Sequence, residues 1–359
     1  MAEPNWDSTE LHHVLRVEMT DPVYRESTFG ALDVVSDSAD ITMDITTDTI
    51  AQASVDVVDW NQWIDNSWIR FVHEIPESQY RRVLGTFFVF NEGRSFNYNS
   101  LGASPTLYSS LKTLTLDSLP KAIFIGEGAP VTRVIASILD PAFVRYIFDG
   151  SCGEYYYTST YVIDAGTTRM DALKSVLKDV GWEYTLNGDG SITFKRFEAY
   201  STRSWTYTLD AQAKKSVIEE NTLKPEDTNR SVPGRSIVIW KGDDSEDEPV
   251  TAYADVDPSN PASPQRRGYI VSEVHELSDL SGERTTENAL VYARNFLEKD
   301  ATPYKRWSMK TLWLPISAGD VIMFRSPESS NFVRSLVENV KYDFSKWKLE
   351  LTIKEVPNE

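Results

Sequence analysis

Four histidines are the side chains best suited to metal binding or acid–base chemistry: His12, His13, His73 and His275. No two of them are four residues apart, the spacing with which two histidines on one helix face ligate zinc in metalloproteases. His12 and His13 are adjacent in a segment that alternates like a strand, so we expect them to point to opposite faces. We interpret the histidines as structural or surface residues and predict no metal site.

The single cysteine lies in the run Gly150-Ser151-Cys152-Gly153-Glu154, which could form the nucleophile loop of a cysteine hydrolase. That chemistry needs a histidine to activate the thiol, and none follows in a context typical of such enzymes. One cysteine also excludes an intrachain disulfide and a multi-cysteine zinc site. We predict that Cys152 is a small buried apolar residue.

Two short motifs resemble ligand-binding loops but lack residues that the ligands need. Gly126-Glu127-Gly128 precedes a predicted helix, as in dinucleotide-binding folds, but the third glycine is missing and Pro130 has no amide proton for a phosphate. Asp255-Val256-Asp257 begins like a calcium loop, yet Asn260 stands where glycine is required and Arg266 where glutamate is required. We predict a plain turn at the first motif and no EF-hand at the second.

Carboxylates and aromatic side chains leave two further chemistries open. A pair of Asp or Glu side chains could do acid and base work in a glycoside hydrolase, but their separation is set in space rather than in sequence. The runs Tyr155-Tyr156-Tyr157 and Trp60-Asn61-Gln62-Trp63 could form a sugar- or peptide-binding platform, although packing and interface roles are the favoured interpretation. The sequence thus predicts no catalytic residue, no cofactor and no metal.

The charge of the chain argues against nucleic acid or anionic lipid as a partner. Its 359 residues carry 36 Lys plus Arg and 54 Asp plus Glu, a formal net charge of −18. Such a surface repels phosphate, and the basic pairs, of which Arg81-Arg82 is one, are short and scattered. No stretch approaches the roughly 18 apolar residues of a membrane span, and the N-terminus lacks signal-peptide features, so we expect folding in a cytoplasm.

Alternating apolar residues predict strands in the first third of the chain. Ile41, Met43 and Ile45 alternate with polar residues, and apolar runs near 68–71 and 83–90 mark two more strands. Leu11 to Met19 supplies an opening strand. An antiparallel, half-exposed sheet or barrel fits this pattern best.

Helical spacing replaces the alternation from about residue 105. Residues 104–114 predict a helix with Leu107, Leu111 and Leu114 on one face, and residues 130–139 predict a second short helix.

The clearest helix covers residues 168–180, where Thr167 or Thr168 can cap the N-terminus and Gly181 can take the left-handed C-terminal position. A β-hairpin follows over residues 182–197, with its turn at Asn187-Gly188-Asp189-Gly190. The helix and the hairpin predict a small α+β unit over residues 121–200.

The last part of the chain returns to strands, predicted at 236–240, 307–313, 321–324 and 347–353. A helix is expected over 286–299. The acidic and proline-broken stretch 242–264 is predicted to be an exposed loop, and its acidic run 243–248 could hold a cation loosely.

The predicted fold class is therefore mainly β with an α+β insertion. Two β-barrel-like domains, residues 1–120 and 201–359, flank the α+β domain 121–200. The sequence does not say whether residues 201–240 belong to the first or the second barrel.

This order of elements resembles the baseplate hub and tail-associated proteins of tailed bacteriophages and related contractile injection machines. The resemblance covers most of the chain as an order of elements. Two segments frequent in that family carry it: the hairpin Gly181-Trp182-Glu183-Tyr184 with Gly190-Ser191-Ile192-Thr193-Phe194, and the turn Leu314-Pro315-Ile316-Ser317-Ala318-Gly319-Asp320-Val321-Ile322.

The resemblance implies a structural protein of the virion tail tip, assembled in the host bacterial cytoplasm, and not an enzyme. Such hubs are trimers whose paired barrels give a pseudo-sixfold ring under the hexameric tail tube. The implied partners are tail tube and distal tail proteins, the tape measure protein, and tail fibre or spike proteins, while DNA transits the lumen without specific binding. An acidic lumen would suit that passage, because phosphate contacts need Lys and Arg.

Two alternatives come from other functional classes. The first is a cell-wall hydrolase of the tail tip that uses an Asp/Glu pair. The second is a carbohydrate-binding adhesion module that displays Trp and Tyr on an open face.

Overall fold

The computed structural model describes residues 4, 6, 11–21, 27–59, 67–91, 93–97, 100–157, 160–227, 232–240, 248–260, 262–277, 285–300 and 305–356. These residues divide into two compact units, the first within 1–223 and 309–353 and the second within 224–308 and 354–358. Strands make up 43% and helices 18%, so the prediction of a mainly β chain is confirmed.

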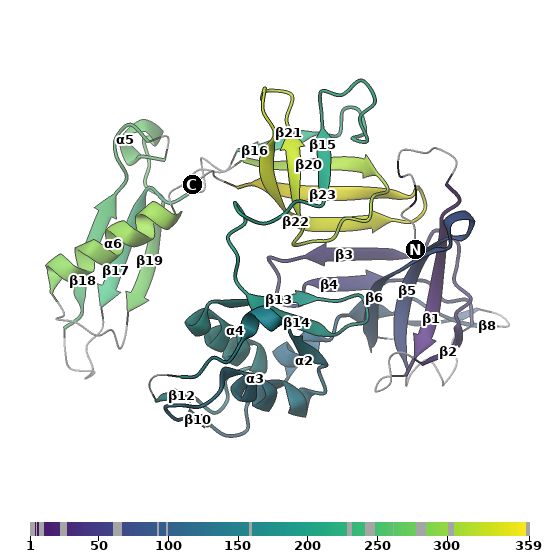
Figure 1. Ribbon diagram of the computed structural model, residues 1–359, viewed down its shortest axis with the longest axis horizontal. Helices are drawn as coiled ribbons and strands as arrows, with labels where there is room; N and C mark the ends of the chain where they lie inside the picture. The colour runs from purple at the N-terminus through teal and green to yellow at the C-terminus, as the bar shows by residue number, and fades with distance from the viewer. Residues whose placement is uncertain are drawn as a thin grey trace. The chain divides into compact units, whose positions relative to one another are not determined.

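One large sheet carries most of the first unit (Figure 1), and its strands have the order β20-β23-β22-β3-β4-β9-β6-β5-β1-β2. In addition, β21 pairs with β22, and β15 pairs with β21. Its strands are β1 (Val14–Thr20), β2 (Thr28–Ala31), β3 (Asp40–Asp44), β4 (Ala51–Ser54), β5 (Trp68–Ile75), β6 (Tyr80–Asn91), β9 (Thr106–Tyr108), β15 (Tyr207–Asp210), β20 (Lys305–Leu312), β21 (Val321–Arg325), β22 (Val333–Asp343) and β23 (Lys348–Glu355). A separate two-stranded ribbon pairs β7 (Arg94–Asn97) with β8 (Ser100–Ala103).

Side-chain alternation explains where the clearest strands form. In β23, Leu349, Leu351 and Ile353 are buried while the residues between them are half-buried. The period of two places one set of side chains on the core face, and these burials stabilise the strand. The strands predicted near 41–45, 307–313, 321–324 and 347–353 are confirmed.

Strands from the N-terminal and C-terminal parts of the chain pair in this sheet through β3 and β22. Asp40–Asp44 pairs antiparallel with Asn339–Asp343, so that Ile41 lies opposite Tyr342. The first half of β22 pairs instead with β21, Val321 lying opposite Leu336. β22 was not predicted, because its buried residues Ser335, Leu336, Val337 and Glu338 are consecutive and do not alternate.

The prediction of two barrel-like domains is corrected by this arrangement. None of the described sheets closes into a barrel. Alternation identifies a strand and its core face but not its partner, and here strands from both predicted barrel regions pair with each other.

Helices gather in residues 111–180 of the first unit: α2 (Leu111–Leu116), α3 (Val131–Leu139) and α4 (Arg169–Val180). Figure 1 shows them beside two small sheets, β10 (Ile123–Ile125) with β12 (Tyr161–Ile163), and β11 (Tyr146–Phe148) with β14 (Ile192–Arg196) and β13 (Trp182–Leu186). Within the described residues of the first unit, short 3₁₀ helices lie at Pro76–Ser78, Asp140–Ala142 and Gly150–Cys152.

The predicted caps of α4 are present. The Thr168 hydroxyl accepts a hydrogen bond from the Asp171 amide at 3.1 Å, and Gly181 adopts a left-handed conformation with φ of 66°. The β13–β14 hairpin follows, with Trp182 opposite Arg196. The helix and the hairpin predicted here are confirmed, whereas the domain boundaries at 120 and 200 stay predictions.

The helix predicted over residues 104–114 is wrong in its first half. Leu107 lies in β9, where it pairs with Ala53 of β4 and Val89 of β6. The helix begins only at Leu111. Pairing on both sides of a buried strand outweighs the weak helical spacing of three leucines.

In the second unit, α6 (Thr286–Asp300) covers one face of a three-stranded sheet (Figure 1). The sheet has the order β18 (Val250–Asp255), β17 (Arg235–Trp240), β19 (Ser272–Leu277). β16 (Lys224–Asp227) pairs with the first residues of β20, and α5 (Pro264–Arg267) is a single turn. The predicted helix over 286–299 and strand over 236–240 are confirmed.

Part of the predicted loop 242–264 is a strand. β18 pairs antiparallel with β17, and its inward residues are Ala252 and Ala254. Because alanine is only weakly apolar, the alternation in β18 is faint, and the acidic residues beside it led to the prediction of a loop. Residues 242–247 lie outside the described residues.

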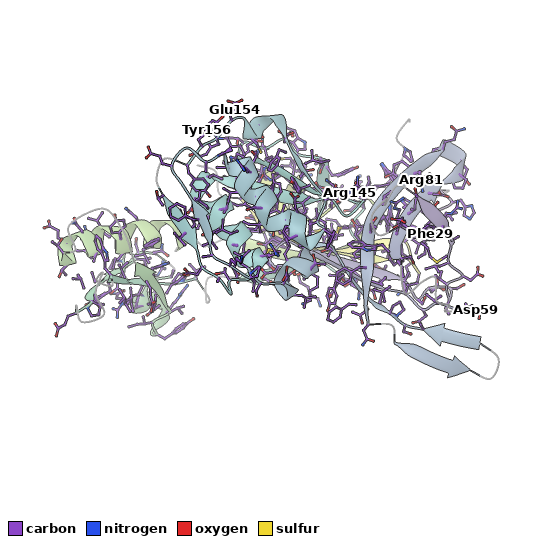
Figure 2. All side chains as sticks on the ribbon, turned by 90° about the horizontal axis from the view of Figure 1, so that it is seen from below. Phe29, Asp59, Arg81, Arg145, Glu154 and Tyr156 are labelled. Atoms are coloured by element: carbon purple, nitrogen blue, oxygen red, sulfur yellow. The ribbon has the colours of Figure 1, made fainter. Side chains whose placement is uncertain are left out.

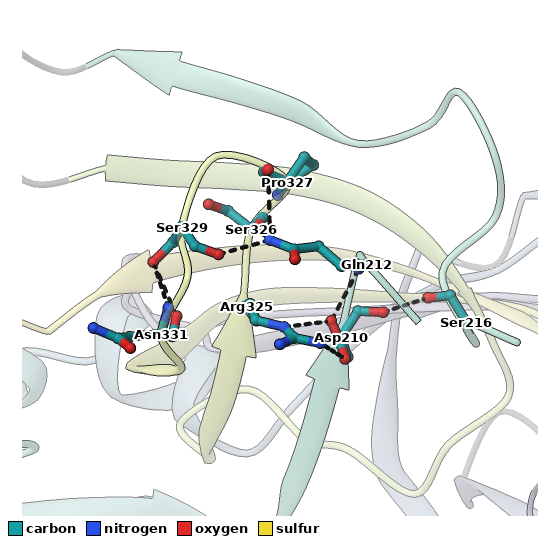
Figure 3. Close-up of polar contacts among 8 residues, drawn as sticks. All are labelled: Asp210, Gln212, Ser216, Arg325, Ser326, Pro327, Ser329 and Asn331. Carbon is teal, nitrogen blue, oxygen red and sulfur yellow. Dashed lines mark hydrogen bonds and ion pairs between the residues drawn. The ribbon is translucent and has the colours of Figure 1, made fainter. Parts of the chain in front are cut away.

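The chain segment after residue 200 joins the large sheet through β15, which pairs parallel with β21. Figure 3 shows the contacts at the end of this pair: Arg325 binds the Asp210 carboxylate, and the Gln212 amide donates to the carbonyls of Ser326 at 2.8 Å and Ser329 at 2.6 Å. Residues 207–210 therefore belong with the C-terminal strands.

We expect Ile41→Ala to lower the free energy of unfolding by about 3 kcal/mol, because Ile41 is fully buried where β3 meets β22. Urea titration measures this as a lower midpoint at an unchanged slope. The control is the half-buried neighbour Thr42→Ala, expected to cost less than about 1 kcal/mol. Equal losses in the two variants would contradict a core role for β3.

Candidate functional site

A cavity of about 380 Å³ lies within the first unit, and the two segments that carry the sequence resemblance form two of its walls. Residues 182–188 of the hairpin contribute one wall, and Ser317, Ala318 and Gly319 of the turn before β21 contribute another. Residues of β3, β4, β6 and α4 complete it. Segments some 130 residues apart in sequence thus meet at one place.

The hairpin is held against β6 by close backbone contact. The Thr86 hydroxyl donates to the carbonyl oxygen of Gly188 at 2.8 Å. A Cβ atom added at Gly188 would lie 2.3 Å from the carbonyl oxygen of Val83, so only glycine fits there. The Ser110 hydroxyl donates to the Gly190 carbonyl at 2.7 Å. These contacts fix the wall before any ligand arrives.

The turn wall is anchored by two side chains from distant strands. Arg82 of β6 donates to the Pro315 carbonyl and, at 2.8 Å, to the Ser317 hydroxyl. The buried Tyr342 of β22 donates to the Ile316 carbonyl at 2.8 Å. Asp320 accepts from the Ser317 amide, and burial raises the pKa of its carboxyl.

The floor of the cavity is apolar and its edge is charged. Ala51, Leu84, Phe87, Leu177 and Trp182 are buried side chains that line it. The charged side chains that line it are Lys174, Lys178, Arg203 and Glu183. Three cations face one carboxylate, the reverse of the balance in the chain as a whole.

Two cationic side chains balance the negative charge of the Glu183 carboxylate. The Arg203 guanidinium lies 2.6 and 2.8 Å from the two carboxylate oxygens, and Lys195 lies 3.3 Å from one of them. Arg203 also stacks on the Tyr200 ring at 4.5 Å. Burial raises the pKa of Tyr184, which also lines the cavity, to about 12, so its hydroxyl stays protonated.

Two of the four histidines form a pair that the sequence did not predict. Nδ1 of His13 lies 2.9 Å from Nε2 of His73, and the rings stack with centroids 5.1 Å apart. His12 is exposed, and its Nδ1 lies 3.7 Å from a carboxylate oxygen of Glu77. His275 stacks on Phe296 of α6, with 4.1 Å between centroids.

Aromatic rings enclose the histidine pair. Trp313 and Trp347 both lie about 5 Å from His73, at 4.8 and 5.1 Å between ring centroids. Burial, His13 and Arg82 together lower the pKa of His73 to about 3, and burial also lowers the pKa of His13. Both imidazoles are therefore neutral at pH 7, and the described residues hold no cluster of three or more His, Cys, Asp or Glu that could ligate a metal.

Cys152 ends a short 3₁₀ helix in the core. Its thiol donates to the Phe194 carbonyl at 3.3 Å, and burial raises its pKa. A reactive cysteine needs the opposite, a stabilised and accessible thiolate.

The two candidate loops are occupied by internal hydrogen bonds. Gly128 has φ of +78°, and its amide donates to the Tyr157 carbonyl at 2.8 Å, which leaves it unable to bind a phosphate. Asp255 binds both arms of the Arg235 guanidinium at 2.6 and 2.9 Å. Asp257 accepts from the Ser259 amide and hydroxyl. The carboxylates bind these neighbours and do not converge on a cation.

The tryptophans that the structure describes are divided between the core and the surface. Of the tryptophans that the structure describes, Trp182, Trp240, Trp307 and Trp313 are buried, and Trp205 is exposed. Tyr155 and Tyr156 are exposed, and Figure 2 places Tyr156 with Glu154 at the outer edge of the helical part of the first unit. Residues 60–63, the other predicted platform, lie outside the described residues.

Within the described ranges, burial raises the pKa of the Asp179 and Asp320 carboxyls. The charged side chains that act on them are cationic, Lys178 on Asp179 and Arg82 and Lys195 on Asp320. In those same ranges, the helices are too short or too polar to span a bilayer.

Large apolar side chains are exposed on the small sheets and turns of residues 121–163. Phe143 is 86% exposed and adopts a positive φ of 55°, an uncommon backbone conformation for a bulky residue. Phe124 of β10 is 72% exposed and lies directly opposite the exposed Val162 of β12. Phe124 and Val162 thus form an exposed apolar pair on adjacent strands.

Solved structures of tail proteins match 94–96% of the chain, and the chain has their fold. A tail protein from Neisseria meningitidis MC58 superposes with a TM-score of 0.66 at 12% identity, over 96% of both chains. The 43 kDa tail protein of prophage MuSo2 from Shewanella oneidensis gives 0.61 at 11% identity, over 95% of this chain and 98% of that one. Prophage tail protein gp18 from Listeria monocytogenes EGD-e gives 0.56 at 14% identity, over 94% of both.

No protein-family model matches the sequence, and no curated protein matches it. The predicted resemblance to phage tail proteins is thus confirmed through the fold.

We expect the histidine pair to make the protein less stable in weak acid. Unfolded His73 gains a proton as the pH falls through about 6.5, whereas the folded residue, with its pKa near 3, does not. The unfolded state then binds the extra proton, so the free energy of unfolding falls by roughly 1.4 kcal/mol per pH unit below pH 6.5. Urea titrations between pH 7.5 and 5 measure this slope.

The variant His73→Phe should flatten that slope between pH 6.5 and 5. The control is Phe344→Leu, which removes a neighbouring ring of the same cluster that carries no proton. Phe344→Leu should lower the free energy of unfolding by the same amount at every pH, so that the slope stays that of the unchanged protein. A slope that survives in His73→Phe would show that other groups cause the acid sensitivity.

Proposed function

We propose that this chain is a structural hub protein at the distal end of a phage tail. Three copies form a pseudo-sixfold ring that joins the hexameric tail tube to the tail tip, fibre or spike, in the virion, and DNA passes through its lumen. The observation that carries the proposal is the match in fold to a tail protein over 96% of both chains.

Two features of the chain support an assembly role over an enzymatic one. Large apolar side chains such as Phe124 and Phe143 face solvent, as contact residues do before assembly. The chemistry-bearing residues Cys152, His73 and Asp255 are each engaged in internal contacts. Assembly in the host cytoplasm and contacts with tail tube, tape measure and fibre proteins complete the proposal.

The net charge of −18 per chain supports DNA passage. Three copies triple this charge, and an acidic lumen repels phosphate, so DNA would slide without adhering. A cryo-electron microscopy map of the ring tests this point, and a basic inner surface would contradict it.

We expect the purified protein to form a threefold ring. Light scattering should give three times the mass of one chain, and negative-stain electron microscopy should show sixfold-like projections. Phe143→Ser should weaken assembly with little loss of subunit stability, because the side chain is almost fully exposed. A protein that stays monomeric at high concentration and is absent from purified tails would rule out the hub.

A further inference from the structure

We propose that the cavity of the first unit is a binding site for an acidic peptide segment, one that inserts an apolar side chain and places a carboxylate at the charged edge. A peptide is the expected occupant because of the proposed assembly role, in which the neighbours of this chain are polypeptides. The site itself is argued from the cavity.

The size and the floor of the cavity suit one large apolar side chain and its flanking backbone. About 380 Å³ is within the range of ligand pockets, and the buried floor residues include Leu84, Phe87 and Trp182. Burying an apolar side chain there gains roughly 25 cal/mol per Å² removed from water.

The walls are set in advance, which lowers the cost of binding. On one side the hairpin is fixed by Thr86 and by the close approach of Gly188 to Val83. On the other side the turn is fixed by Arg82 and Tyr342. A site that does not have to order itself loses less entropy when it is filled.

The charge at the edge selects an anion. Arg203 is committed to Glu183, and Lys174 to Asp48, but Lys178 forms no hydrogen bond or ion pair within the described part of the chain. Lys178 is exposed, and its charge acts on the neighbouring Asp179 carboxyl, but its ammonium has no hydrogen-bond partner in the described part of the chain and lies beside an apolar floor. On a chain of net charge −18, a cation-lined cavity is a local exception that favours a carboxylate.

Fluorescence anisotropy on the purified full chain tests the site with three labelled pentapeptides. Each has phenylalanine second and leucine fourth, and the remaining positions are all glutamate, all glutamine or all lysine. We expect saturable binding of the glutamate peptide, roughly tenfold weaker binding of the glutamine peptide, and none of the lysine peptide. Binding should weaken with added salt, because Lys174 and Lys178 at the edge are exposed.

Two variants locate the binding. Lys178→Glu should weaken the glutamate peptide roughly three- to tenfold, whereas the control Lys121→Glu, the same charge reversal at an exposed lysine outside the cavity, should leave it unchanged. Ala318→Trp fills the cavity and should abolish binding, with an unchanged circular dichroism spectrum to show an intact fold.

Three results would overturn the proposal: equal affinity for the glutamate and glutamine peptides, equal loss in the two lysine variants, or tighter binding of dodecanoate than of the glutamate peptide. The last would assign the cavity to a fatty acid. The hub and the site fail separately, since a monomer that binds the peptide contradicts only the hub, and a threefold ring that does not bind it contradicts only the site.

Discussion

The pairing of β3 with β22 is the constraint on which the rest of the first unit depends. It brings together residues such as Asp44 and Asn339, 295 positions apart, whose side chains also share a hydrogen bond of 3.1 Å. Closing so long a loop costs entropy, although the cost grows only slowly with length. The buried side chains of both strands, Ile41 and Val340 among them, offset that cost.

The cavity is a consequence of this pairing. β22 carries Tyr342, whose hydroxyl holds the turn before β21, and β3 contributes Met43 to the lining. The hairpin wall depends on β6 of the same sheet through Thr86. Separating the N-terminal strands from the C-terminal strands would therefore take the walls apart, so the cavity requires the continuous sheet.

The histidine pair shows how the same sheet creates an environment that neither segment has alone. His13 directly precedes β1, and His73 lies in β5, the strand that pairs with β1. Trp313 and Trp347, which contact the two imidazoles, come from the C-terminal part of the chain. Enclosure by these rings removes water from two imidazoles and lowers the pKa of both. The two imidazoles are thus packed within the aromatic cluster as neutral groups.

The amino-acid sequence alone determined the local elements with strong patterns. These are α4 with its Thr168 cap and Gly181 terminus, the β13–β14 hairpin, α6, and the alternating strand β23. Each depends on contacts within a few residues, so spacing and capping suffice to predict it. The two segments that carried the resemblance to tail proteins also came from the sequence.

Only the tertiary structure decided which strands pair and which side chains meet. The first half of β22 lacks alternation, and β18 turns two alanines inward, so neither segment has a clear local signal. Open sheets in place of barrels, the His13–His73 contact and the cavity between the hairpin and the turn all join residues far apart in sequence. Sequence patterns fix the faces of strands but not their partners, because partner choice is set by the packing of the whole core.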